Sequence, residues 1–441
     1  MRLTVIGTGY VGAVHAACMA EIGHEVLGVD IDRERVTALA GGRVPFFEPG
    51  LSQMLVKAVN AGRLGFTTSL AEAVRFGDTH FVCVGTPQDP ASGVADLRYL
   101  HSVVDELAGC LDGSAHDEVL MVGKSTVPVG TAARLARRLG AVSPAADVAW
   151  NPEFLREGCA VQDTLRPERV VAGVRTEHAE ARLRAVYAPL LDAGAPFVST
   201  DLATAELVKM ASNAFLATKI SFINAMAEVC DATGADVLTL AHAMGQDSRI
   251  GPRFLAPGLG FGGSCLPKDI RAFTARAEEL GLGRSVGFLR QVDEINTRQR
   301  KRTVELAKRL LGGSFADRNV AVLGAAFKPF SDDIRDSPAL AVAEMVRSRG
   351  ATVRVHDPEA VDNARAASPE LQFALDVAKA CERADVVLHL TEWPEYRQLD
   401  PEALATVVRT PALVDARNTL DPLPWRSAGW TLRALGRPGL D

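Results

Sequence analysis

A glycine-rich segment carries the thiol that is best placed for chemistry. Residues 258–263 contain four glycines, and Ser264 and Cys265 follow them directly. Glycines let a backbone approach a bulky ligand closely. Cys265 is predicted to begin a helix that runs through Asp269, where N–H groups and the neighbouring Lys268 would stabilise a thiolate. The pattern favours a nucleophile, although on spacing alone a cysteine packed under a glycine turn has equal support.

Three polar residues share one face of a long predicted helix. Residues 203–232 are strong helix formers and include neither glycine nor proline. Glu206, Lys209 and Asn213 stand at positions i, i+3 and i+7 of this helix and therefore lie on one face. Because most of the helix is apolar, we expect this face to point inward, where a lysine and an amide would bind a developing oxyanion. A solvated polar face is the alternative.

The chain begins with a phosphate-binding pattern. Gly7-Thr8-Gly9-Tyr10-Val11-Gly12 follows a predicted strand and opens a predicted helix, which is the context in which such glycines bind a dinucleotide. Asp30 ends the next predicted strand, where a carboxylate accepts hydrogen bonds from ribose hydroxyls and repels a 2′-phosphate. NAD is therefore favoured over NADP. Arg33 and Arg35 weaken this preference, since either could pair with phosphate.

Further polar segments follow apolar strands. Residues 84–87 and 124–128 are predicted to lie at the carboxyl edge of a parallel sheet, where ligands bind, although either segment could be only a turn. Residues 151–158 and 249–251 add carboxylates and guanidinium groups. Spacing alone assigns these groups no role.

The surrounding elements predict an α/β fold. From residue 1 to about 200, short strands alternate with Ala-rich helices, which predicts a parallel sheet covered by helices on both faces. The opening pattern recurs from Asn319, with a helix from Ser337 and a strand that ends near Asp357. The sequence therefore predicts two Rossmann-like, doubly wound domains joined by the long central helix. The apolar residues of that helix occupy more than one face, which predicts burial on several sides.

Composition narrows the classes of function. The 441 residues include 48 Lys and Arg against 54 Asp and Glu, without a concentrated basic tract for nucleic acid. No apolar run reaches the roughly 18 residues that would predict a membrane span. The start reads directly as a strand rather than as a signal peptide, which predicts a cytoplasmic protein. Seven scattered cysteines without a CxxC pair indicate neither a disulfide framework nor a metal site. Apart from Cys265, we expect them to be buried and inert.

Together these motifs resemble the UDP-glucose and GDP-mannose dehydrogenase family over nearly the whole chain. The matching segments, in chain order, are residues 7–12, 84–87, 125–130, 151–158, 206–213, 249–251, 261–269, 324–338 and 415–418. Residues 163–170 resemble the UDP-glucose branch more than the others. UDP-glucose is therefore the expected substrate, with GDP-mannose or a UDP-N-acetylhexosamine as the alternative.

The resemblance implies a four-electron oxidation that consumes two NAD. The sugar 6-hydroxyl would lose a hydride, and Cys265 would capture the aldehyde as a thiohemiacetal. Loss of a second hydride would leave a thioester, whose hydrolysis gives the uronate. Capture on sulfur keeps a reactive aldehyde from escaping. Two other functions stay open: a dehydrogenase that stops at the aldehyde, and a non-catalytic sensor of NAD and a nucleotide-sugar.

The resemblance also implies residue roles. Cys265 would be the nucleophile, Lys209 and Asn213 would stabilise the oxyanion, and Asp269 would orient or activate water. Glu153 and Thr126 would transfer protons through water. The residues implied at NAD are Gly7, Gly9, Tyr10, Val11, Gly12, Asp30, Arg35, Thr86, Thr126, Glu157, Lys268 and Arg335. The residues implied at the sugar nucleotide are Glu153, Phe154, Leu155, Arg156, Glu157, Lys209, Asn213, Arg249, Phe254, Gly258, Gly260, Phe261, Gly262, Phe327, Lys328 and Arg417.

A division into three parts completes the expectation. Residues 1–200 would bind NAD, residues 201–300 would form a central helical region with the Cys265 loop, and residues 301–441 would bind the UDP-sugar. Arg249 would reach the site of a second subunit. That reach requires a homodimer, with the long helix as its core.

Overall fold

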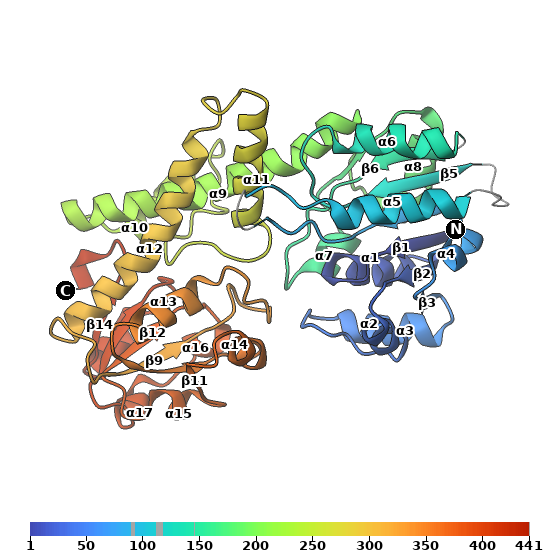
Figure 1. Ribbon diagram of the computed structural model, residues 1–441. Coiled ribbons are helices and arrows are strands. Elements are labelled where there is room, and N and C mark those ends of the chain that lie inside the picture. The colour runs from blue at the N-terminus through green and yellow to red at the C-terminus, as the bar shows by residue number, and fades with distance from the viewer. Residues whose placement is uncertain (90–92, 112–117, 145, 441) are drawn as a thin grey trace. The chain divides into compact units, whose positions relative to one another are not determined.

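The computed structural model describes residues 1–89, 93–111, 118–144 and 146–440. Contacts divide the chain into two compact units. Unit 1 comprises Met1–Ser212 and Arg271–Gly281, and unit 2 comprises Asn213–Ile270 and Leu282–Asp441. Figure 1 shows that each unit is built around its own sheet. The predicted α/β class with two Rossmann-like sheets is confirmed, whereas the three-part division at residues 200 and 300 stays a prediction.

Unit 1 contains an eight-stranded sheet in the order β3-β2-β1-β4-β5-β6-β7-β8. Its strands are β1 (Arg2–Ile6), β2 (Glu25–Val29), β3 (Leu64–Thr67), β4 (Thr79–Val82), β5 (Val119–Gly123), β6 (Ala146–Trp150), β7 (Val170–Gly173) and β8 (Phe197–Thr200). The expectation of a wholly parallel sheet was wrong at one place. β7 joins β6 antiparallel through the single pair Trp150 and Gly173.

Helices cover both faces of this sheet. Alternate residues of β5 enter different cores: Leu120 and Val122 pack on one face, Val119 and Met121 on the other. The first face is covered by α1 (Tyr10–Glu21), α3 (Leu51–Asn60), α7 (Ala160–Leu165) and α8 (Glu177–Asp192). The second face is covered by α4 (Leu70–Phe76), α5 (Arg98–Leu111) and α6 (Thr131–Val142). Burial on both faces explains why the strands are continuously apolar.

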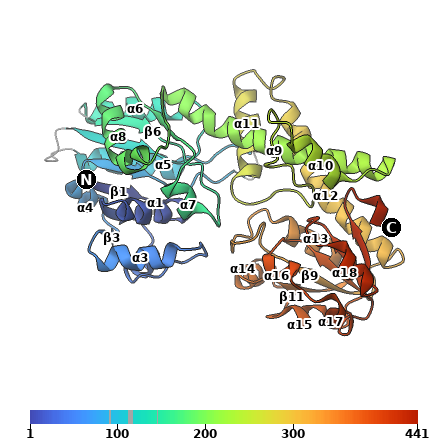
Figure 2. The ribbon, with the colours of Figure 1, turned by 180° about the vertical axis from the view of Figure 1, so that it is seen from behind.

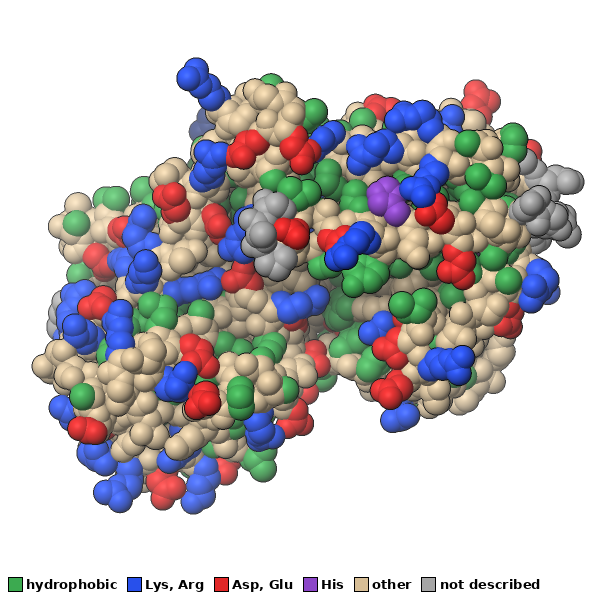
Figure 3. All heavy atoms as spheres, viewed as in Figure 1, with side chains coloured by type: hydrophobic (Ala, Val, Ile, Leu, Met, Phe, Trp, Pro, Cys, Tyr) green, Lys and Arg blue, Asp and Glu red, His purple; other side chains and the backbone are tan. Residues whose placement is uncertain are grey.

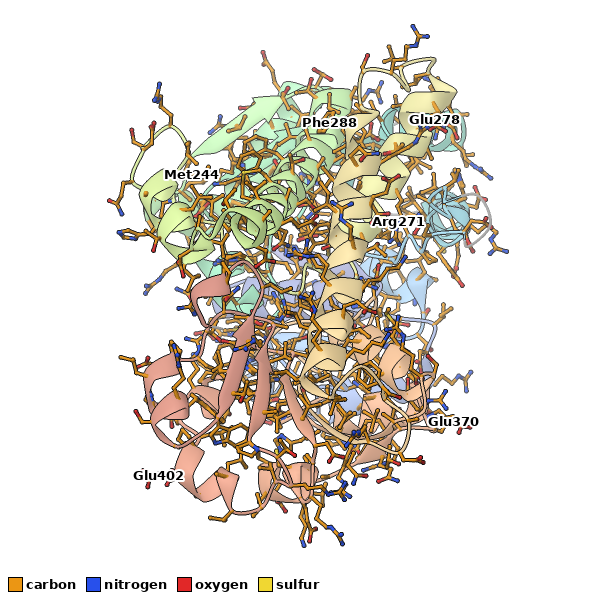
Figure 4. The ribbon with its side chains drawn as sticks, turned by 90° about the vertical axis from the view of Figure 1, so that its left-hand side faces the viewer. Met244, Arg271, Glu278, Phe288, Glu370 and Glu402 are labelled. Atoms are coloured by element: carbon orange, nitrogen blue, oxygen red, sulfur yellow. The ribbon has the colours of Figure 1, made fainter. Side chains whose placement is uncertain are left out.

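The long helix predicted over residues 203–232 is α9, Leu202–Thr233, which Figure 2 draws as one unbroken coil. In unit 2 it packs against α10 (Val237–Gly245) through a small apolar cluster that includes Ile223, Ala227 and Val237. The side chain of Asp236 caps α10 by accepting a hydrogen bond from the Thr239 N–H at 2.8 Å. Figure 4 marks the last turn of α10 with Met244.

Unit 2 contains a six-stranded parallel sheet in the order β11-β10-β9-β12-β13-β14. Its strands are β9 (Asn319–Leu323), β10 (Thr352–His356), β11 (Gln372–Phe373), β12 (Val386–His389), β13 (Ala412–Asp415) and β14 (Thr431–Ala434). The longer helices are α11 (Leu266–Glu279), which unit 1 shares, α12 (Phe288–Leu310) and α13 (Pro338–Arg347). Figure 4 labels Phe288, where α12 begins.

The two sheets repeat one local arrangement, as the sequence predicted. Gly7 donates its N–H to the Val29 carbonyl at 2.7 Å, and Gly324 donates to the His356 carbonyl at 2.8 Å. The residue after each glycine donates to the carboxylate after the second strand: Thr8 to Asp30 at 2.8 Å, and Ala325 to Asp357 at 2.7 Å. The same glycine turn therefore precedes the first helix of both sheets.

The cysteines differ in part from the expectation. All seven lie within the described residues, and they form no disulfide there. Cys18, Cys83, Cys230 and Cys381 are buried as expected, and burial raises the pKa of Cys83 to about 12. Cys110 and Cys159 are only half-buried, which contradicts the expectation. Cys159 is the N-cap residue of α7 and therefore lies at the end of that helix.

The last features of the fold are the distribution of charged side chains and the hydropathy of the helices. On the face in Figure 3, acidic and basic side chains are intermingled, in keeping with the formal net charge of −6. Among the helices in the described ranges, none has both the length and the apolar character that crossing a bilayer requires.

Candidate functional site

The glycine turn of unit 1 has the shape of a dinucleotide cradle. Gly7 has φ +88°, and a Cβ on Gly12 would lie 1.8 Å from the Gly7 carbonyl oxygen, so both positions require glycine. A Cβ on Gly9, in contrast, would meet nothing within 4 Å. Gly9 precedes α1, whose Tyr10 and Val11 are half-buried. Open space at a helix N-terminus fits the pyrophosphate of NAD.

Asp30 is held as a buried anion beside this turn. Its Oδ2 accepts hydrogen bonds from the Thr8 N–H at 2.8 Å, the Thr8 hydroxyl at 3.1 Å and Arg35 at 3.0 Å. Burial by itself would raise the pKa of Asp30, but these donors and the N–H of Asp32 lower it. Arg35 also pairs with Asp32 at 3.5 Å. Arg35 therefore pairs with two carboxylates beside the glycine turn, and its contact with NAD stays a prediction.

The strand-end segments of unit 1 are brought together. The Thr86 hydroxyl donates to the Thr126 carbonyl at 2.7 Å, and the Ser125 hydroxyl donates to the Val84 carbonyl at 2.6 Å. Thr86 is buried and Thr126 half-buried. The loops after β4 and β5 therefore form one continuous edge beside the glycine turn.

Lys209 and Glu153 form a buried ion pair. Lys209 Nζ lies 3.0 Å from Glu153 Oε1, and 5% and 9% of the two side chains are exposed. The other oxygen of Glu153 accepts the Leu155 N–H at 2.9 Å. The Phe154 ring lies between cations, with its centroid 5.6 Å from Lys209 Nζ and 4.2 Å from the Arg169 guanidinium carbon. Two residues predicted for proton transfer and oxyanion binding are thus in direct contact.

Glu206 has a different role from its neighbours on α9. Its carboxylate accepts the N–H groups of Gly130 and Ala132, both at 2.6 Å, at the N-terminus of α6. Glu206, Lys209 and Asn213 are all buried, so the face that they share points inward as expected. Glu206 itself caps a helix with a buried carboxylate.

A buried lysine begins the second of the strand-end segments, residues 124–128, for which the sequence left open a ligand-binding edge or a simple turn. Lys124 donates to the side-chain oxygen of Asn151 at 3.0 Å, and the Tyr187 hydroxyl donates to the same oxygen at 2.6 Å. Asn151 in turn donates to the Val171 carbonyl at 2.7 Å. Burial lowers the pKa of Lys124. These hydrogen bonds hold Asn151 in place, two residues before Glu153.

In unit 2, Cys265 directly precedes α11, as predicted. The thiol is half-buried, and its sulfur lies 3.5 Å from the Ser264 hydroxyl. Asp269, one turn later and almost fully buried, accepts hydrogen bonds from Asn213 at 2.6 Å and from Lys268 at 2.8 Å. Lys268 is thus directed to Asp269. The structure thus brings Asn213 of α9 to Lys268 and Asp269, which lie on the helix that Cys265 precedes.

The glycines before Cys265 approach other parts of unit 2. A Cβ on Gly258 would lie 2.7 Å from the Ala416 carbonyl oxygen, and one on Gly262 would lie 2.4 Å from the Asp336 carbonyl oxygen. Asn296 brackets Phe261, accepting its N–H at 2.8 Å and donating to its carbonyl at 2.9 Å. Tight packing within the protein, in addition to any ligand, therefore explains this glycine run. Asn296 carried no signal in the sequence.

Arg417 joins three backbone segments of unit 2. Its guanidinium donates to the carbonyls of Leu390 at 2.6 Å, Gly260 at 3.0 Å and Phe327 at 3.2 Å. The Lys328 ammonium lies 5.3 Å from the centre of the Phe327 ring. Arg417 therefore positions the loops around the glycine segment, and Lys328 projects from one of them.

The other predicted arginines pair with acids in their own segments. Arg156 pairs with Asp163 at 2.7 Å, Arg249 with Asp247 at 2.6 Å and Arg335 with Asp333 at 2.7 Å. The three arginine side chains are largely exposed. Phe254 has a left-handed φ of 64°, while Glu157 is buried before the turn at Gly158.

Sequence reasoning missed Glu48. This buried carboxylate accepts hydrogen bonds from Tyr10 and from the backbone after Glu157. Its only signal was its place between Phe47 and a Pro-Gly turn, which is a weak one.

Known proteins match nearly the whole chain. Family models match the UDP-glucose/GDP-mannose dehydrogenase family: its NAD binding domain over residues 1–191, its central domain over residues 203–298 and its UDP binding domain over residues 321–422. The UDP-glucose 6-dehydrogenase of Rhizobium meliloti (strain 1021) is 41% identical, with 99% of this chain and 100% of the relative covered. That of Pseudomonas aeruginosa is 42% identical, with 99% and 98% covered.

Solved structures agree with this result. A UDP-glucose dehydrogenase from the hyperthermophilic archaeon Pyrobaculum islandicum matches with a TM-score of 0.90 and 39% identity, over 99% of this chain and 97% of that one. A UDP-D-ManNAc dehydrogenase from Pyrococcus horikoshii matches with a TM-score of 0.85 and 27% identity, over 99% and 100%. The chain is therefore a dehydrogenase with NAD as its cofactor, and it belongs to the UDP-glucose/GDP-mannose dehydrogenase family.

Proposed function

We propose that the chain oxidises the 6-hydroxyl of UDP-glucose to a carboxylate and consumes two NAD. Relatives named UDP-glucose 6-dehydrogenase, 41% and 42% identical over nearly the full length of both chains, support this substrate. The observation that carries the chemistry is Cys265 at the start of α11, one turn before the buried pair of Asp269 and Asn213. A protein that only sensed NAD and a nucleotide-sugar would need no such thiol.

The residues of unit 1 fit NAD and a proton-transfer role. Bound NAD supplies the hydride acceptor. The open space at Gly9 suits the pyrophosphate, and the ionised Asp30 suits ribose hydroxyls. The Lys209 and Glu153 pair would hold the substrate hydroxyl, with Glu153 and Thr126 moving its proton through water. Because both charges are buried, their effect on a reacting oxygen is stronger than it would be in water.

The thiol would divide the oxidation into two similar steps. The alcohol loses a hydride and a proton and becomes an aldehyde. The Cys265 sulfur then adds to the aldehyde carbon, and the carbonyl oxygen takes a proton to give a thiohemiacetal. Loss of a second hydride and a proton leaves a thioester on Cys265. A developing oxyanion in these steps would be stabilised by Lys209 and Asn213.

Hydrolysis would complete the reaction and regenerate the thiol. A water adds to the thioester carbon, the carbon–sulfur bond breaks, and the sulfur recovers a proton while the sugar leaves as the uronate. Asp269 lies one turn after Cys265 and would orient or activate that water. Its contacts with Asn213 and Lys268 hold the carboxylate in place for this task.

The test is the amount of NADH formed per UDP-glucose consumed, in wild type and in Cys265→Ser. Two NADH per sugar, with the variant stalled or inactive, is the expected result. One NADH would mean an aldehyde product and would contradict the thioester. A parallel panel with GDP-mannose and UDP-N-acetylmannosamine tests the sugar, and faster turnover of either would replace UDP-glucose as the substrate.

We also propose a homodimer centred on α9, in which Arg249 reaches the partner's site. Three large apolar side chains, spaced seven residues apart, are exposed on the unit 2 part of this helix: Phe215 (66%), Phe222 (45%) and Val229 (51%). Such a stripe on a well-formed helix is typical of a helix that packs against another. We propose that a second copy of this chain packs against this stripe.

Sedimentation velocity tests the dimer. Phe222→Glu is expected to give monomers, because a charge would be buried without a partner. Val142→Glu is the matched control, since Val142 is an exposed apolar residue at the end of α6, outside the stripe. A wild-type monomer, or a dimer that persists in Phe222→Glu, would contradict the proposal.

A further inference from the structure

Glu48 is a buried carboxylate that the proposed reaction does not use. It lies in the loop between α2 (Arg33–Ala40) and α3, and only 5% of it is exposed. An ionised carboxylate is costly to bury unless several donors satisfy its oxygens. The contacts of Glu48 therefore identify what it is there to hold.

Two separate segments supply those donors. Oε2 accepts a hydrogen bond from the Tyr10 hydroxyl and another from the Gly158 N–H at 2.6 Å. Oε1 accepts the N–H groups of Ala160 at 2.7 Å and Val161 at 3.4 Å. The Gly158 N–H also lies 3.1 Å from the Tyr10 hydroxyl oxygen. One side chain thus joins the first residue of α1 to the first turn of α7.

Both segments adjoin the cradle for NAD. Tyr10 follows Gly9, the glycine with open space beside it. Gly158 follows the buried Glu157, which the family resemblance implies at NAD. Gly158 has φ +76°, so the turn after Glu157 depends on a backbone conformation that favours glycine. The Glu48 contacts set the position of this turn relative to the glycine turn.

The chemistry of the contact requires a carboxylate and a phenol. Burial and the neighbouring Glu48 raise the pKa of Tyr10, so its hydroxyl stays protonated and donates. All the groups facing Glu48 in these contacts are donors, and a carboxylate is a pure acceptor. Phe46 packs against the Tyr10 ring with centroids 4.8 Å apart, so the loop that carries Glu48 also fixes the phenol.

We propose that Glu48 is a positioning residue for NAD: by joining Tyr10 to residues 158–161, it holds the glycine turn and the Glu157 turn at the spacing that the dinucleotide needs. This role of Glu48 rests on the binding of NAD by unit 1 and does not depend on which sugar is oxidised. It concerns binding of the cofactor and not the steps on Cys265.

The experiment that tests this role compares Glu48→Gln with the wild-type full-length chain. Glutamine keeps the shape but turns an NH₂ toward N–H donors, so we expect the Kd and KM for NAD to rise by about tenfold or more, as for the loss of a charged hydrogen bond. At saturating NAD, kcat should stay within about twofold. Tyr10→Phe removes one donor to Glu48 and leaves the backbone N–H groups on the carboxylate, so it should raise the Kd less.

A matched control separates this role from stability alone. Asp385 is also a buried carboxylate that accepts a backbone N–H, that of Asn319 at 2.8 Å, but it lies in unit 2. Asp385→Asn should lower the melting temperature and leave the Kd for NAD unchanged. If Glu48→Gln behaves in the same way, Glu48 is only structural and the proposal is wrong.

Two further measurements separate a failure of this proposal from a failure to fold and from a wrong substrate. If Glu48→Gln does not fold, Glu48→Asp retains the charge, and an unchanged Kd for NAD in that variant would contradict the proposal because its shorter side chain cannot reach both segments. The Kd for NAD is measured without sugar. A wild type that binds NAD but leaves UDP-glucose unoxidised would therefore refute the proposed substrate and not the role of Glu48.

Discussion

The ammonium nitrogen of Lys209 lies 3.0 Å from a carboxylate oxygen of Glu153, and both side chains are almost completely buried. The two residues are 56 positions apart in the sequence, so the pair exists only in the folded chain. Removing Lys209 takes the paired cation away from a buried carboxylate, which costs about 3 to 5 kcal/mol. This relationship leads to the first prediction.

Lys209→Met is expected to abolish turnover and to lower the free energy of unfolding by about 3 to 5 kcal/mol. The double variant Lys209→Met with Glu153→Gln should be more stable than Lys209→Met alone, because it buries no unpaired charge. Denaturant unfolding of the four proteins in the cycle measures the coupling. Additive effects of the two substitutions would mean that the ion pair contributes nothing.

The glycine turn predicts opposite results at two neighbouring glycines. Gly12→Ala should prevent folding of unit 1, because its Cβ would lie 1.8 Å from the Gly7 carbonyl oxygen. Gly9→Ala should leave the melting temperature nearly unchanged and raise the KM for NAD about tenfold or more, because its Cβ fills the space for the pyrophosphate. Thermal unfolding and steady-state kinetics check both. Normal NAD binding by Gly9→Ala would show that the pyrophosphate does not bind beside Gly9.

Asp30 should determine the choice between NAD and NADP. Asp30→Ala removes the ribose acceptor and releases Arg35, which now pairs with Asp30 at 3.0 Å. The ratio of kcat/KM for NADP to that for NAD should therefore rise by about tenfold or more. The double variant with Arg35→Ala should lose this gain. An unchanged ratio in Asp30→Ala would show that discrimination resides elsewhere.

Arg417 should be irreplaceable by lysine. Arg417→Ala removes three hydrogen bonds to backbone carbonyls, so we expect the free energy of unfolding to fall by about 2 to 4 kcal/mol. Arg417→Lys should recover little of this loss, because one ammonium cannot span carbonyls that a planar guanidinium reaches together. Urea unfolding gives the comparison. Full recovery by lysine would show that charge alone matters there.

The sequence by itself determined the local features. The glycine turn at residues 7–12, the carboxylate after β2 and the thiol at the start of α11 were predicted where the structure has them. The long helix was predicted over residues 203–232 and spans Leu202–Thr233. These features depend on short-range geometry, such as the turn that glycine permits and the unbonded N–H groups at a helix start, which neighbouring residues specify.

Only the tertiary structure decided how distant polar groups pair. Sequence placed Glu206 beside Lys209, but packing turned Glu206 to the start of α6 and Lys209 to Glu153. Packing likewise brought Glu48 to Tyr10 and Asn296 to Phe261. Each of these side chains is buried and must find its partner wherever the fold brings one within hydrogen-bond distance. Spacing along the chain carries no information about contacts that form across it, so these pairings could not be predicted.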